Sequence, residues 1–439
     1  MENWKNLFHL FVTVFLSYFA TLVVNPTIAD VTMEAVCPVI CFAHILSFDS
    51  VQIGGLGSVI LMPLIGTLSD EYGRKALLTI PLSFSIIPLV ILALKRTTEF
   101  FYVFYVLKTF TSMVTEGGII CLSLSYLADN VSEGKRVSAF GLLGGVISAA
   151  TVCGTLAARL LPTTRIFQVA AVVSVVAAVY MRIFLKDTTR HIDALEQPIL
   201  KPGTETNDVG NEPLKKTDVI KKIPLPKEIL RLLQSSATVS LASFVAFFNG
   251  LADAGVQAFL MYYLKARFHF QKDQFAEILL ITYIGATISN MILMPILGPL
   301  LGEETLLCIG LFAGFLNMLF YSIAWSSWVP YAAAWFGIFL FLSSPSIRCI
   351  ISKQVGPYEQ GIAQGCLMGI ASFATAVSPL IFSPLSALFF SEAAPFHFTG
   401  FSMLCVGIAY LVGFILSTMI KVRPLLSRGR VCGEPCTLA

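Results

Sequence analysis

Long apolar stretches, separated by short polar segments, follow one another along almost the whole chain. We count twelve of them, each of roughly 20 residues or more, the length at which an α-helix crosses about 30 Å of bilayer hydrocarbon. Barrel strands would instead give short segments of alternating hydrophobicity, and the sequence shows no such run. The pattern predicts an all-α membrane protein with twelve transmembrane helices in two six-helix halves. The helices are expected at residues 7–29, 51–69, 76–94, 101–128, 137–159, 166–185, 237–264, 275–300, 305–324, 329–349, 361–388 and 398–420.

The composition changes abruptly in the middle of the chain, where five prolines stand among many lysines and acidic residues. Such a stretch cannot bury enough apolar surface to fold, so we expect a largely disordered linker between the two halves. The predicted order is an N-terminal six-helix half at 1–185, a cytoplasmic linker at 186–235, a C-terminal six-helix half at 236–420 and a cytoplasmic tail at 421–439.

Composition supports a membrane location. Of 439 residues, 56% are hydrophobic and 13% are charged, and the mean hydropathy is +0.80. Soluble domains carry about 25% charged residues. The net charge of +3 is too small to indicate a nucleic-acid partner. We therefore expect an integral, multi-pass protein of the plasma membrane or an endomembrane, with the lipid bilayer as its partner.

Lysines and arginines predict the orientation, because short cytoplasmic loops carry an excess of them. With the N-terminus inside, the inside segments carry Lys5, Arg74, Lys75, Lys135, Arg136, Arg348, Lys353, Lys421, Arg423, Arg428 and Arg430. The outside segments carry Lys95, Arg96, Arg159, Arg165, Lys265, Arg267 and Lys272. This bias places both termini in the cytoplasm.

Polar residues recur every four positions on three of the predicted helices, which puts them on one face of each helix. The first helix carries Thr13, Ser17, Thr21 and Asn25, the fourth carries Lys108, Ser112 and Glu116, and the seventh carries Asn249, Asp253 and Gln257. In the tenth helix, the serines at 343, 344 and 346 gather near one end. Polar side chains in hydrocarbon usually face a bundle interior or a water-filled cavity. The candidates for a substrate or proton cavity are Asn25, Lys108, Glu116, Asn249, Asp253 and Gln257.

Other interpretations of these stripes stay open. The Ser, Thr and Asn side chains could instead join helices by hydrogen bonds, and Glu116 or Asp253 could form a buried ion pair with Lys108. Desolvation favours the neutral form of a carboxyl group. Glu116 and Asp253 are therefore candidates for binding protons or a cationic substrate.

The loop between the second and third predicted helices carries a motif. It reads Gly-Thr-Leu-Ser-Asp-Glu-Tyr-Gly-Arg-Lys from residue 66 to residue 75. Gly66 allows close helix contact, Gly73 permits a tight turn, and Asp70 can pair with Arg74. This loop resembles the signature loop of the major facilitator superfamily. The resemblance implies that Gly66, Asp70, Gly73 and Arg74 contact the eleventh helix and gate the cytoplasmic side.

A second segment, Ser125-Tyr126-Leu127-Ala128-Asp129 at the end of the fourth helix, resembles the tetracycline-efflux branch of that family. The likeness extends to the hippocampus-abundant-transcript-like proteins, and most to their plant members. Two features depart from the branch. The stretch that begins at Gly154 lacks the proline and later glycines typical of antiporters, which argues against antiport. The second-half copy of the signature loop is reduced to Gly298, Gly302, Glu303 and Glu304, without a basic residue.

We expect a secondary active transporter that moves a small organic solute by alternating access. Under one form of this hypothesis, transport is coupled to protons. The alternative is a membrane sensor or scaffold that keeps the fold without moving a solute. An enzyme is not expected: the sequence contains neither a phosphate-binding Gly-rich loop nor a His/Cys/Asp cluster with metal-ligand spacing. No catalytic residue, metal or cofactor is predicted, and the partners are a small-molecule substrate and, under the coupled hypothesis, protons.

Overall fold

A computed structural model of the chain describes residues 2–25, 28, 42–94, 97–186, 234, 236–356, 358–390 and 398–431. The predicted linker lies outside these ranges except at residues 186 and 234. Within the described ranges, twelve helical spans are long and apolar enough to cross a membrane. The prediction of an all-α, twelve-helix membrane protein is confirmed.

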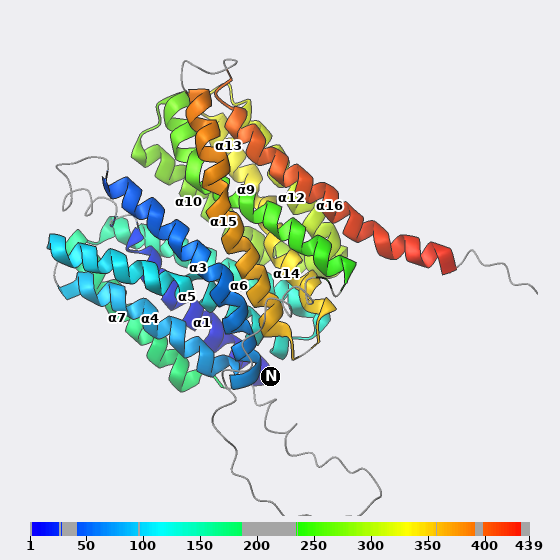
Figure 1. Ribbon diagram of the computed structural model, residues 1–439, viewed down its shortest axis with the longest axis horizontal. Coiled ribbons are helices and arrows are strands. Elements are labelled where there is room, and N and C mark those ends of the chain that lie inside the picture. Colours follow the sequence, from blue (N-terminus) through cyan, green and yellow to red (C-terminus); the bar gives the residue numbers. More distant parts are fainter. Residues whose placement is uncertain are drawn as a thin grey trace, which may run out of the picture.

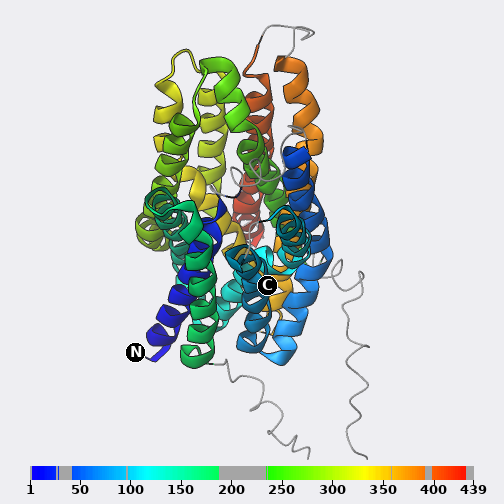
Figure 2. The ribbon, with the colours of Figure 1, turned by 90° about the vertical axis from the view of Figure 1, so that its left-hand side faces the viewer.

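The first half consists of α1 (Glu2–Leu22), α3 (Phe42–Tyr72), α4 (Arg74–Leu94), α5 (Thr98–Asn130), α6 (Glu133–Leu160) and α7 (Thr163–Phe184). The second half begins with α9 (Ala237–Phe268) and a composite span of α10 (Lys272–Ile288), η3 (Ser289–Leu293) and α11 (Met294–Leu301). It continues with α12 (Glu303–Ser322), a composite span of α13 (Val329–Phe336), η4 (Gly337–Leu342) and α14 (Ser343–Gln354), and then α15 (Gln360–Phe390) and α16 (Phe401–Val431). Figures 1 and 2 show the two halves as two groups of helices.

Several helix boundaries differ from the sequence prediction. The regular part of α1 ends at Leu22, earlier than residue 29, while α14 continues to Gln354 and α16 to Val431. Both extensions add polar, basic turns to an apolar span. Hydropathy marks only the part of a helix that lies in lipid, so it does not detect such turns.

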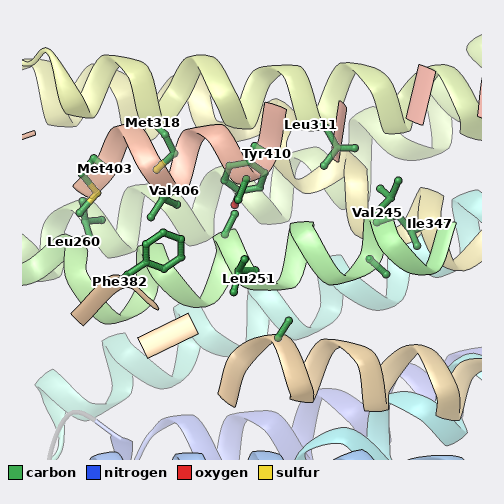
Figure 3. Close-up of a cluster of buried hydrophobic side chains, with 14 of the residues drawn as sticks. Val245, Leu251, Leu260, Leu311, Met318, Ile347, Phe382, Met403, Val406 and Tyr410 are labelled. Atoms are coloured by element: carbon green, nitrogen blue, oxygen red, sulfur yellow. The ribbon is translucent and has the colours of Figure 1, made fainter. Parts of the chain in front are cut away.

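The second half has its own hydrophobic core. Figure 3 shows Tyr410 of α16 among Met318, Val406 and Leu311. Asn317 donates a hydrogen bond to the carbonyl of Ala333 at 2.6 Å, beside the 3₁₀ segment η4. The same carbonyl also accepts the N–H of Gly337, so the amide adds a second hydrogen bond where the tenth span leaves regular α-helical geometry.

The halves join at the end of the molecule that carries residues 66–75, which we call the signature-loop end. The core cluster there contains Leu122 and Phe140 of the first half together with Met294 and Leu342 of the second. The cluster near the opposite end, which includes Phe104 and residues of α1, α4, α5 and α7, contains first-half residues alone. In Figure 1, α3 and α15 lie side by side near the signature loop and diverge toward the opposite end. The packing is therefore closed at one end.

Candidate transport cavity and its closed end

A cavity of about 680 Å³ lies between the halves, lined by residues of α1, α3, α4, α5, α9, α14 and α15. Its lining includes all six residues that the sequence proposed for a substrate or proton cavity: Asn25, Lys108, Glu116, Asn249, Asp253 and Gln257. The four-residue spacing has this effect because each stripe occupies one face of a helix, and the fold turns the three faces toward one another.

The stripe of the first helix divides between two roles. Ser17 and Thr21 line the cavity, as does Asn25, which lies just beyond the end of α1. Thr13 is buried and donates its hydroxyl hydrogen bond to the carbonyl of His9 in its own helix. Three of the four residues are thus available to a ligand.

Asp253 is held by neutral donors. Its carboxylate accepts hydrogen bonds from Asn249 Nδ2 at 2.7 Å and from the hydroxyl of Tyr410 in α16 at 2.5 Å. Ser343 in turn donates to Asn249 Oδ1 at 2.9 Å. The acid therefore belongs to a network that joins α9, α14 and α16, and this network fixes its orientation at the cavity wall.

Glu116 has fewer constraints. Its side chain is exposed within the cavity, and no described residue donates a hydrogen bond to its carboxylate. Lys108 lies two turns away on the same face of α5, is attracted electrostatically by Glu116, and has its ammonium 5.8 Å from the centre of the Phe104 ring. Among the described residues, neither Lys108 nor either acid takes part in an ion pair within 4.0 Å. The buried ion pair left open by the sequence is not formed.

The position of Arg348 corrects the sequence prediction, which counted it with the cytoplasmic residues although it lay at the end of the predicted helix 329–349. Because α14 continues to Gln354, Arg348 lies six residues before the helix end and lines the cavity. Ser344, four residues earlier on the same face, lines it too. Both residues lie in the predicted helix 329–349, so the four-residue spacing that identified the other stripes could have found this pair. Sequence reasoning also missed Tyr18, another lining residue, because an aromatic residue gives no polar-stripe signal.

At the closed end, the Asp70 carboxylate connects the two halves. Its oxygens accept hydrogen bonds from the backbone N–H groups of Gly361 and Ile362, each at 2.9 Å. These are groups of the first turn of α15, which have no acceptor within the helix. The helix dipole also favours a negative charge at this position. The acid of one half thus caps a helix of the other.

Arg74, the first residue of α4, holds this arrangement together. It pairs with Asp70, and its Nε donates to Asp129 Oδ2 of α5 at 2.9 Å. Gly73 takes φ 91°, a conformation that side-chain-bearing residues rarely adopt, and so makes the turn between α3 and α4. We call Asp70, Arg74, Asp129 and the N–H groups of Gly361 and Ile362 the Asp70 cluster.

Gly66 lies where α3 and α15 approach most closely. A Cβ atom at Gly66 would be 2.2 Å from the carbonyl oxygen of Gly361, and one at Gly361 would be 2.3 Å from that of Gly66. Two backbones meet here with no space for a methyl group. Cys121 is fully buried behind this contact, with its sulfur 3.9 Å from the Gly361 carbonyl oxygen.

The second half contains a charge-reversed counterpart of the Arg74–Asp129 pair. Gly302 takes φ 76° immediately before α12, as Gly73 does before α4. Glu303, the first residue of α12, pairs at 2.6 Å with Lys353, the penultimate residue of α14. The basic residue missing from the reduced loop is therefore supplied by another helix. Sequence alone could not pair residues fifty positions apart.

Among the described residues, no group of three or more His, Cys, Asp or Glu side chains could hold a metal ion. The polar groups of the cavity are instead hydroxyls, amides, two acids and two bases. This set can bind a polar organic solute, and its acids can take up a proton.

Comparisons with known proteins agree with this architecture. The chain is 22% identical over 403 residues to human Hippocampus abundant transcript 1 protein, covering 90% of this chain and 76% of that one. It is 24% identical over 342 residues to the class G tetracycline resistance protein of Vibrio anguillarum, covering 75% and 78%.

Solved structures share the fold. The human organic anion transporter MFSD10 (TETRAN) superposes with a TM-score of 0.74 at 16% identity, covering 95% of this chain and 100% of that one. The E. coli fucose:proton symporter FucP gives a TM-score of 0.66 at 11% identity, covering 94% and 98%. The sequence pattern of the Major Facilitator Superfamily matches residues 10–379. The chain therefore belongs to the Major Facilitator Superfamily, a family of integral multi-pass membrane transporters and not of enzymes.

Proposed function

We propose that the protein is a secondary active transporter that moves a small organic solute by alternating access. The observation that carries this proposal is the polar cavity between the halves, which is closed at the signature-loop end by the Asp70 cluster. In the orientation given by the lysines and arginines, this arrangement corresponds to an outward-facing state. Rocking of one half against the other would expose the same residues to the cytoplasm. Relatives named for tetracycline resistance and organic anion transport support a small organic solute.

The test is transport by purified protein in proteoliposomes. Metabolite mixtures are loaded on one side, and the compounds that cross are identified by mass spectrometry against protein-free vesicles. We expect at least one solute to cross in a protein-dependent manner. Protein that is folded and correctly inserted but moves none would favour the sensor or scaffold alternative.

We further propose that Glu116 carries a coupling proton. Its carboxylate faces the cavity and no described residue donates a hydrogen bond to it, whereas Asp253 is held by Tyr410 and Asn249. A group that must gain and lose a proton during each cycle has to be accessible and lightly constrained. Asp253 is accordingly given the role of orienting the wall of the cavity.

This proposal predicts a difference between two matched variants. Under an imposed pH gradient, wild-type flux should rise, Glu116→Gln should remove the dependence on the gradient, and Asp253→Asn should keep it while the overall rate falls. The measurement is initial flux with and without the gradient for all three proteins. Gradient-independent wild-type flux would refute coupling. Retained dependence in Glu116→Gln would move the proton to another residue.

A further inference from the structure

Two cations line the cavity, Lys108 and Arg348, and among the described residues neither forms an ion pair within 4.0 Å. Lys108 has Glu116 two turns away on its own face of α5, whereas α14 contains no acid beside Arg348. The guanidinium Nη1 lies 3.4 Å from Gln364 Oε1 and Nη2 lies 2.9 Å from the sulfur of Met368. A thioether is a weak acceptor, and a guanidinium has five N–H donors to satisfy. No carboxylate of the described residues lies within 4.0 Å of it.

Its electrostatic surroundings agree with the hydrogen-bond geometry. The titratable groups that act on Arg348 are the Tyr18 hydroxyl and the Cys121 thiol, both ordinarily uncharged at neutral pH. Glu116 acts on Lys108 and on Tyr18. An arginine remains charged even when buried, and burial of an unpaired charge is costly.

The basic residues near the signature-loop end have partners in the fold. Arg74 has Asp70 and Asp129, and Lys353 has Glu303. Arg136 donates to the carbonyl of Ser352 at 3.2 Å. Arg348 differs from all of these, and it also differs in lining the cavity. The missing partner of this side chain is therefore expected to come from the cavity.

The residues around Arg348 indicate what that partner is. Leu367 and Met368 of α15 and Ile347 of α14 add apolar surface to the same lining, and Ser344 adds a hydroxyl one turn away. A guanidinium fork matches the two oxygens of a carboxylate. Arg348 lies about 9 Å from the end of α14, at 1.5 Å per residue, and so toward the closed end.

Resting on the proposed transport function, we propose that the solute is an organic anion, and that Arg348 binds its carboxylate or similar oxyanion while the apolar residues beside it contact the body of the molecule. Lys108 lies ten residues from the start of α5, nearer the opposite end of the cavity. Its charge attracts the anion before the anion reaches Arg348.

The test measures binding separately from transport. A set of small aromatic and aliphatic compounds is prepared in three forms on each skeleton: carboxylate, primary amide and aminomethyl. Binding to purified protein is measured by ligand-observed NMR, in buffer without other organic anions. We expect the carboxylates to bind wild type, with affinity about 10- to 100-fold weaker in Arg348→Gln, the range for loss of a charge-assisted hydrogen bond.

Two variants keep the result interpretable. Arg348→Lys retains the charge without the fork, so carboxylate binding should be intermediate even if Arg348→Gln fails to fold. Arg182→Gln, which removes an exposed arginine of α7 outside the cavity, should bind like wild type. The proposal is overturned if amides or amines bind wild type as well as carboxylates do, if no carboxylate binds, or if Arg348→Gln binds carboxylates undiminished.

Failure of transport gives a different result. If carboxylates bind through Arg348 but proteoliposomes move none of them, the anion site stands and the transport proposal fails. If solutes cross the vesicle membrane irrespective of their charge and of Arg348, transport stands and the anion site is wrong.

Discussion

The carboxylate of Asp70 connects the two halves at the signature-loop end through two backbone N–H groups of α15. Hydrogen bonds to a charged acceptor are about twice as strong as neutral ones. The charge of this side chain therefore contributes to the closed state of that end, together with the Arg136–Ser352 hydrogen bond and the shared apolar core. Cys121, fully buried behind the contact, provides a natural reporter of its opening.

We predict that Asp70→Asn opens the signature-loop end more often. Loss of one charge-assisted hydrogen bond, about 1.5 kcal/mol, corresponds to about a tenfold rise in the open population. The rate at which a thiol reagent alkylates Cys121, followed by peptide mass spectrometry, should rise accordingly, and transport should fall. Glu99→Gln, at an exposed site of α5, is the matched control. Unchanged alkylation and transport in Asp70→Asn would remove the gating role.

At the scale of elements, the pairing of α3 with α15 depends on glycine at the crossing. The backbones of Gly66 and Gly361 meet where neither could carry a methyl group. Close helix contact of this kind, through small residues, is common in membranes because packing is a main source of helix association there. The two helices therefore pack tightly at this crossing without side chains between them.

Gly66→Ala should force α3 and α15 apart. We expect faster alkylation of Cys121 and reduced transport, with the protein still inserted in the membrane. Gly134→Ala is the matched control, since a Cβ there would have nothing within 4 Å. Alanine is also favoured over glycine inside a helix by about 1 kcal/mol. If Gly66→Ala and Gly134→Ala gave the same Cys121 alkylation rate and the same transport, the close contact of α3 with α15 would not be needed to keep this end closed.

The pair of Glu303 and Lys353 links the start of α12 to the end of α14 within the second half. Glu303→Lys should lower the melting temperature in detergent by about 2–4 °C, because two like charges then meet at a partly buried site. The double variant Glu303→Lys/Lys353→Glu, which exchanges the two charges, should recover most of the lost melting temperature. A double variant no more stable than the single one would mean that the pair contributes nothing as a pair.

At the scale of the whole molecule, the lysine and arginine count predicts the orientation in the bilayer. Moving Arg348 into the cavity leaves ten inside residues against seven outside. The bias toward cytoplasmic termini persists after the correction. The Asp70 cluster is then expected at the cytoplasmic face.

This orientation predicts the result of protease protection. Protease added to sealed right-side-out vesicles should leave the linker at 186–235 uncut, and permeabilisation should allow cleavage. An external epitope of a known protein in the same vesicles controls for protease activity. Cleavage in sealed vesicles would reverse the orientation and the outward-facing assignment with it.

Apolar run length, polar spacing and the signature loop determined a large part of this protein. Twelve helices followed from hydropathy, since lipid demands about 20 apolar residues per crossing. The stripes on the first, fourth and seventh helices followed from helical periodicity. All of their residues except Thr13 line one cavity. Both signals are local, so a sequence carries them directly.

Tertiary structure alone decided which groups are partners. By spacing, Asp253 was a cavity acid or an ion-pair partner of Lys108, but Tyr410, 157 residues away, binds it. Arg348 was counted with the cytoplasmic residues at the end of the tenth predicted helix, but the helix continues beyond it and Arg348 lines the cavity. Glu303 lacked a base until the fold brought Lys353 beside it. Ionisable groups in a membrane act according to their neighbours, and neighbours on different helices are set by packing, which no local pattern encodes.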